Sequence, residues 1–78
     1  MNREELIERI TTVFRSVFED PDLIISEGTK PEDVENWDSI GHMYLVYELE
    51  DEFGIEFDER VHEVSRVADL VDLIIEKL

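Results

Sequence analysis

Apolar residues recur at intervals of three and four in three stretches of this chain, and that spacing limits the fold more than any other feature. It places apolar side chains on one face of an α-helix, so each stretch is predicted to be a helix with a buried face. The stretches cover residues 4–18, about 39–53 and 67–78. Their apolar residues are Leu6, Ile7, Ile10, Val13, Phe14, Val17 and Phe18; Ile40, Met43, Tyr44, Val46, Tyr47, Leu49 and Phe53; and Val67, Leu70, Val71, Ile74, Ile75 and Leu78.

Local signals predict where these helices begin and end. Asp20-Pro21 ends the first helix, because proline disfavours helical geometry in the residue before it. Asp38 or Ser39 is expected to cap the second helix, and Gly54 is expected to end it in a left-handed conformation. Ser65 is the expected cap of the last helix.

The connections contain two shorter helical signals. A turn is predicted at Thr29-Lys30-Pro31-Glu32, with proline at its first helical position. Another is predicted over residues 58–62, capped by Asp58. The apolar residues expected to pin the long loop of residues 22–38 onto the core are Leu23, Ile24, Ile25, Val34 and Trp37.

The predicted fold class is all-α. We expect a small four-helix bundle with three main helices, one short third helix and a long loop between the first and second helices. Residues 1–78 are expected to form a single domain, since a chain of this size builds one small core. The residues of the second helix assigned to that core are Leu45, Val46, Leu49 and Phe53.

Composition narrows the classes of function. Twenty-two acidic residues face seven basic ones, giving a net charge of −15 that repels nucleic acid and attracts basic protein surfaces. There is no cysteine, so no thiol of the chain itself can act as nucleophile or metal ligand. No apolar run is long enough to span a membrane, and neither a deep catalytic cleft nor a metal site is expected. A cytoplasmic, monomeric and non-catalytic protein is therefore predicted.

One short motif makes the prediction specific. Asp38-Ser39-Ile40 opens the second helix, which ends in Glu50-Asp51-Glu52-Phe53-Gly54-Ile55. Across its whole length the chain resembles the acyl carrier protein family, which is marked by Asp-Ser-aliphatic at the start of an acidic second helix. Trp37 before the motif and Gly41-His42 after it resemble discrete carriers of specialised pathways.

The resemblance implies that Ser39 carries a 4'-phosphopantetheine arm, with Asp38 holding the turn. A separate phosphopantetheinyl transferase would move the arm from coenzyme A, and the arm's thiol would carry acyl intermediates as thioesters in fatty-acid, polyketide or related biosynthesis. The resemblance also implies partner enzymes with basic docking surfaces. The residues expected to contact them are Ile40, Met43, Glu48, Asp51 and Glu52. If acyl chains enter the bundle, Leu45, Val46, Leu49, Phe53 and Ile74 would line the cavity.

Other interpretations stay open at this level. A D-alanyl, aminoacyl or peptidyl carrier would have a similar fold and serine, and an unmodified acidic module could bind basic proteins without an arm. Ser39 could be only a helix cap. His42 invites a role as base for Ser39, but no orienting group or oxyanion donor accompanies it. His62 is expected at the surface.

Overall fold

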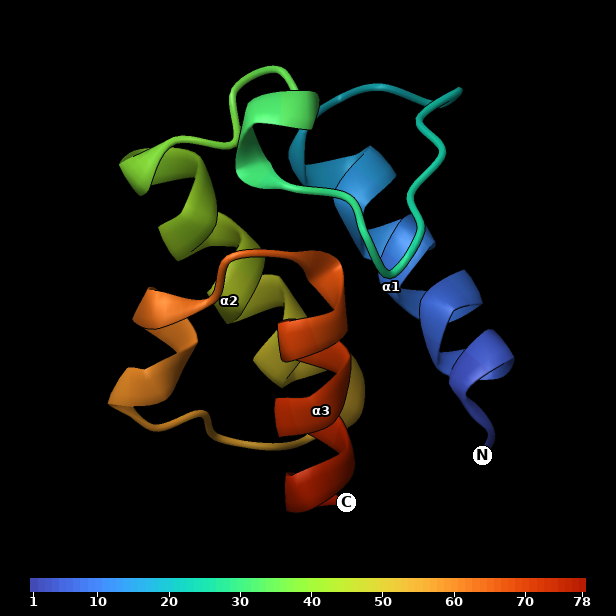
Figure 1. Cartoon of the computed structure of the whole chain (residues 1–78), viewed down its shortest axis with the longest axis vertical. Coiled ribbons are helices and arrows are strands. Elements are labelled where there is room, and N and C mark those ends of the chain that lie inside the picture. Colours follow the sequence, from blue (N-terminus) through green and yellow to red (C-terminus); the bar gives the residue numbers. More distant parts are fainter.

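The computed structural model describes all 78 residues and contains helices but no strands. Three α-helices, α1 (Arg3–Val17), α2 (Ser39–Phe53) and α3 (Val67–Lys77), alternate with two short 3-10 helices, η1 (Pro31–Asp33) and η2 (Glu59–Glu63) (Figure 1). The all-α prediction is confirmed. The expected short third helix forms only as the five-residue η2, so the molecule has three α-helices rather than four. No helix is long and apolar enough to cross a membrane.

The helices begin and end largely where local signals predicted. Asp38 is the N-cap of α2, its Oδ1 accepting the Gly41 N–H at 2.8 Å, and Gly54 ends the helix with φ 64°. Pro31 opens η1 and Asp58 caps η2 as expected. The predicted Ser65 cap is wrong: Arg66 occupies the cap position of α3.

Asp69 is the reason that Ser65 does not cap α3. Its carboxylate reaches back to accept from the Ser65 N–H at 2.9 Å and from the Ser65 hydroxyl at 3.0 Å. The first two N–H groups of α3 donate to carbonyls far away in the sequence. Val67 donates to the Thr29 carbonyl and Ala68 to the Glu27 carbonyl, both at 2.9 Å. The start of α3 is thus capped in part by the long loop.

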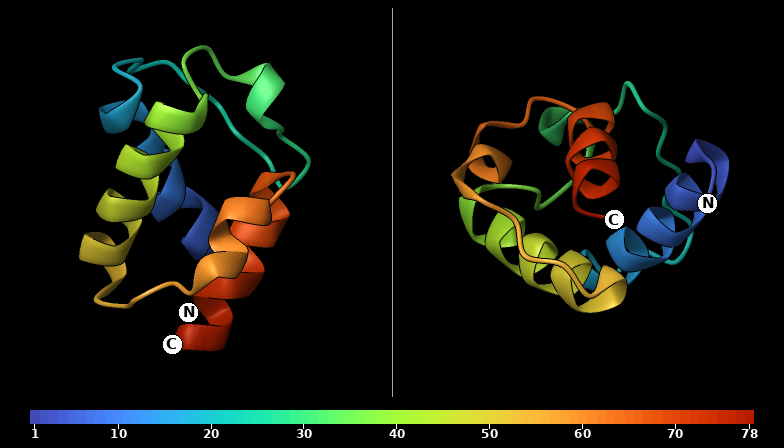
Figure 2. Two further views of the ribbon diagram at one scale, coloured as in Figure 1. Left: turned by 90° about the vertical axis from the view of Figure 1, so that its left-hand side faces the viewer. Right: turned by 90° about the horizontal axis from the view of Figure 1, so that it is seen from below.

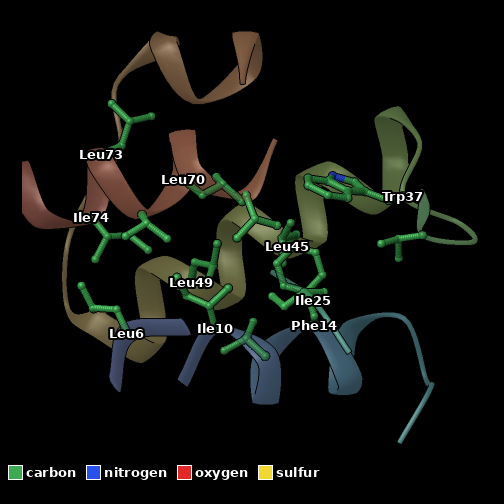
Figure 3. Packing of buried hydrophobic residues seen from close by; sticks show 14 of the residues in the cluster. Leu6, Ile10, Phe14, Ile25, Trp37, Leu45, Leu49, Leu70, Leu73 and Ile74 are labelled. Carbon is green, nitrogen blue, oxygen red and sulfur yellow. The ribbon is translucent and has the colours of Figure 1, made fainter. Parts of the chain in front are cut away.

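The core fills the space between the three α-helices (Figure 3). Leu45 and Leu49 are fully buried, as predicted. Val46 and Phe53 only pack against its edge, and the Arg9 guanidinium covers the Phe53 ring at 4.4 Å from the centroid. Trp37 lies at the opposite end of this core from Ile74 (Figure 3).

Three apolar side chains attach the long loop between α1 and α2 to the core. Ile25, Val34 and Trp37 are buried in the core as predicted, whereas Ile24 is 82% exposed and anchors nothing. Figure 2 shows that η1 and the start of α2 lie at one end of the molecule, away from the two chain termini, while the middle of the loop runs down to the start of α3. That end carries the candidate site.

Candidate functional site

Ser39 is the first residue of α2 and is exposed to solvent. Asp38 performs the capping, and no protein group hydrogen-bonds the Ser39 hydroxyl. The backbone N–H groups of Ser39 and Ile40 also have no protein acceptor, as expected for the first turn of a helix. The structure therefore separates the two roles that the sequence left overlapping: Asp38 is the cap, and Ser39 presents a free hydroxyl.

Gly41 allows the loop to approach this first turn closely. A Cβ built on Gly41 would lie 2.1 Å from the Asn36 carbonyl oxygen and 2.9 Å from the Phe18 ring. Such distances exclude any side chain unless the backbone moves. Asn36 itself has φ 72°, a left-handed conformation that asparagine tolerates better than most residues. The turn before Ser39 is thus built by this close contact.

His42 is fully engaged in hydrogen bonds. Its Nδ1 accepts from the Trp37 indole N–H at 3.0 Å, and its Nε2 lies 2.8 Å from the Val61 carbonyl oxygen. Neither nitrogen is free to take a proton from Ser39. His62, exposed as predicted, approaches the His42 ring edge-on at 5.9 Å between centroids.

An open hollow of about 620 Å³ lies beside Ser39. It is bounded by the loop, the first turn of α2 and η2. Its lining residues are Pro31, Trp37, Asp38, Ser39, His42, Met43, His62 and Val64. None of the residues expected to line an acyl cavity in the core contributes to this hollow, and Leu45, Leu49 and Ile74 are completely buried.

Ion pairs hold η2, one wall of the hollow, onto α3. Arg60 Nη2 contacts Asp58 Oδ2 at 2.8 Å and Glu76 Oε1 at 2.7 Å. The hydrogen bonds from Arg60 lower the pKa of Asp58 and of Glu76 below their usual range. These pairs are exposed, so they orient η2 more than they stabilise it.

The outer face of α2 runs down from Ser39 and carries apolar and acidic side chains together. Its large exposed apolar residues are Ile40 (67%), Met43 (59%), Tyr44 (64%) and Tyr47 (72%). Glu48 and Asp51 are exposed beside them and make no ion pair. Glu52, predicted with them, turns instead toward α1, where its Oε2 lies 2.9 Å from Arg9 Nη2.

No family model matches the chain. A full-length comparison does find a relative: an acyl carrier protein of Thermosynechococcus vestitus is 32% identical over 80 residues, covering 100% of this chain and 98% of the relative. The chain belongs to the acyl carrier protein family.

A solved structure agrees with this assignment to the acyl carrier protein family. The solution NMR structure of a holo acyl carrier protein from Geobacter metallireducens superimposes with a TM-score of 0.83 at 33% identity. The match covers 91% of this chain and 83% of the other. The resemblance read from Asp38-Ser39-Ile40 is therefore confirmed at the level of family and fold.

Sequence reasoning missed what His42 does in this acyl carrier protein. One of its partners, Trp37, is only five residues away, but across a turn whose path the sequence does not specify. The other, Val61, is nineteen residues away. The sequence contains one signal for this contact, because Trp37, Gly41 and His42 lie close together around the Asp38-Ser39-Ile40 motif. Taken alone, that signal indicates only a carrier subtype.

Proposed function

We propose that this acyl carrier protein carries acyl groups as thioesters on a 4'-phosphopantetheine arm esterified to the Ser39 hydroxyl. One observation carries the assignment of Ser39: Asp38 caps α2, so the Ser39 hydroxyl is exposed and unbonded at the rim of the 620 Å³ hollow. A hydroxyl in this state is accessible to a modifying enzyme. No base within the chain is required, because a separate phosphopantetheinyl transferase supplies the chemistry.

The surroundings of Ser39 suit a phosphodiester. The N–H groups of Ser39 and Ile40 have no protein acceptor and lie in the first turn of α2. At this end of a helix the dipole favours a negatively charged group. The hollow beside Ser39 offers the apolar surfaces of Trp37, Met43 and Val64. When bound, the arm would supply the thiol that a chain without cysteine lacks.

Intact mass spectrometry tests the attachment directly. The chain is incubated with coenzyme A, Mg²⁺ and a broad-specificity phosphopantetheinyl transferase, and a gain of roughly 340 Da is expected, as for a covalent modification by one arm. Ser39→Ala should gain nothing. Ser65→Ala is the matched control, since Ser65 also precedes a helix but is bonded to Asp69. No gain in the unsubstituted chain, or a gain that persists in Ser39→Ala, would contradict the proposal.

Absence of any mass gain would instead favour the alternative function, an acidic module that binds basic proteins without an arm.

If the arm is attached, the next experiment identifies the cargo. The modified chain is offered acyl, D-alanyl and aminoacyl donors together with their transfer enzymes. We expect acyl groups to be accepted, because the large apolar residues beside Ser39 suit them.

We further propose that the outer face of α2 docks partner enzymes that have basic surfaces. Ile40 and Met43 would give apolar contact next to the arm, and Glu48 and Asp51 would steer the encounter. Glu52 would contribute less, because Arg9 already pairs with it. The net charge of −15 opposes self-association, so the proposed carrier acts as a monomer. We propose that it works in the cytoplasm.

Charge reversal tests the docking surface. Asp51→Lys should lower kcat/KM for loading several-fold at low ionic strength, and the deficit should shrink in high salt as screening removes the steering. Glu8→Lys, an equally exposed reversal on α1, is the control and should have little effect. Equal losses in the two variants would mean that net charge, rather than the face of α2, attracts the partner.

A further inference from the structure

The two hydrogen bonds of His42 fix its chemical state. An indole N–H can only donate, so Nδ1 of His42 must be an acceptor; a carbonyl can only accept, so Nε2 must carry the proton. The ring is therefore the neutral Nε2–H tautomer, and both of its nitrogens are satisfied. A neutral histidine is the natural choice here, because it offers one acceptor and one donor in fixed directions.

Each partner of His42 is itself held firmly by a different part of the molecule. Trp37 is only 5% exposed, and its ring packs edge-on against Phe14 of α1 at 5.1 Å between centroids. Val61 is 1% exposed in η2, the segment that Arg60 clips to α3. His42 thus joins the loop packed on α1 to the segment packed on α3, through the first turn and a half of α2.

Residues on both sides of this connection line the hollow beside Ser39. Trp37, which immediately precedes Asp38-Ser39, is one of them, and so is His62, the residue after Val61. His42 also lines the hollow, three residues after Ser39, with its ring centroid 6.2 Å from that of Trp37 and 5.9 Å from that of His62. The His42 ring is thus in a position to hold these two segments relative to each other.

We propose that His42 is a positioning residue for the group attached to Ser39. By bonding Trp37 and Val61 at once, it fixes the width of the hollow and holds the Trp37-Asp38 turn, so that the Ser39 hydroxyl is presented in one geometry to the modifying enzyme. The inference rests on the proposed attachment at Ser39. It assigns His42 no proton transfer.

Two substitutions separate the two bonds. In His42→Asn the side-chain oxygen can replace Nδ1 and accept from Trp37, but the bond to Val61 is lost. In His42→Gln the amide can replace Nε2 and donate to Val61, but Trp37 loses its acceptor. Glu63→Gln is the matched control, because Glu63 lies in the same η2 segment, is exposed and does not line the hollow.

The indole proton of Trp37 reports the first bond without any loading reaction. Trp37 is the only tryptophan, so its Nε1–H signal in a proton NMR spectrum is unambiguous. We expect this signal to move upfield and to exchange faster with water in His42→Gln, and to stay near its original position in His42→Asn and Glu63→Gln. An unchanged signal in His42→Gln would overturn the hydrogen bond itself.

Loading rates then test the positioning role. Measured at a temperature where melting curves show each variant fully folded, kcat/KM of the transferase should fall roughly tenfold in His42→Gln, the scale of a small misplacement of a reacting group. His42→Asn, which keeps the bond that holds the turn before Ser39 but loses the bond to Val61, should lose less of the rate, and Glu63→Gln should load normally. A purely structural role would lower melting temperatures and leave these rates equal, which would overturn the proposal.

Trp37→Phe covers the case in which His42→Gln does not fold. It removes the indole N–H and keeps an aromatic ring against Phe14, so it should reproduce the loss in loading rate; a normal rate would overturn the proposal. If the unsubstituted chain fails to load, the attachment at Ser39 fails, and the indole signal still decides whether His42 holds Trp37.

Discussion

Helices α2 and α3 use their apolar residues in opposite ways. α3 has eleven residues and buries six of them, whereas α2 has fifteen and buries only Leu45 and Leu49. The remaining large apolar residues of α2 lie mostly on its outer face, next to Ser39. The apolar pattern of α3 is thus explained by the core, whereas the exposed apolar residues of α2 are what the proposed docking of a partner would use.

The sharpest test of this contrast is a pair of truncations. Ile74→Ala in α3 removes a completely buried side chain and should lower the free energy of unfolding by about 2–5 kcal/mol. Ile40→Ala in α2 removes the same atoms from a site that is 67% exposed and should change it by less than about 0.5 kcal/mol. Urea titration of both variants measures the two values. Similar losses would show that the outer face of α2 is part of the core.

Substitution of two glycines gives the next largest expected effect and tests how tightly the first turn of α2 packs against the loop. Gly41→Ala forces a Cβ against the Asn36 carbonyl and should cost about 1–3 kcal/mol, as overpacking does. It should also slow loading at Ser39, since the turn before it must move. Gly28→Ala, in the loop before α2 with no atom within 4 Å of its Cβ, is the control and should be nearly neutral in both measurements.

The smallest effect concerns the cap of α3 and depends on pH. The hydrogen bond from the Ser65 N–H is the main reason that the pKa of Asp69 lies below its ordinary value of 3.8. A carboxyl group whose pKa is lowered by folding stabilises the folded state above its unfolded pKa and loses that contribution as pH falls toward its folded pKa. Asp69→Ala should therefore cost about 1 kcal/mol at pH 7. Melting curves of the two proteins should converge below about pH 4; a constant gap across this range would contradict the role of the charge.

Local signals in the sequence predicted most of the fold, because the helix ends depend on neighbouring residues. Asp38 and Gly54 define α2 through their own side chain and backbone, and Pro31 does the same for η1. The predicted start of α3 was wrong because it depends on residues far away in the sequence. The N–H groups of Val67 and Ala68 donate to carbonyls of the long loop, and the Asp69 N–H donates to the Arg66 carbonyl, so no vacant donor was left for Ser65 to cap.

The sequence placed the predicted site residues on one helix but did not specify how the site is built. All of them are exposed on α2, and their functional roles stay predictions; they are Ser39, Ile40, Met43, Glu48 and Asp51. Glu52 differs because its charge is paired with Arg9 across the interface with α1, a contact no local pattern specifies. The role of His42 depends on Val61, which the chain brings near only after η2 has packed.

The bonds from the long loop to the start of α3 have a consequence for when the site exists during synthesis. The carbonyls of Glu27 and Thr29 bond the N–H groups of Ala68 and Val67, and Arg3 pairs with both Glu27 and Asp72. While a ribosome is still making residues 60–70, the loop that ends at Asp38 has only the pair between Arg3 and Glu27, because Val67, Ala68 and Asp72 have not yet folded. If Ser39 carries the arm as proposed, the loop before it gains these anchors only after α3 has emerged, so we expect the folded chain to be modified more readily than a nascent one.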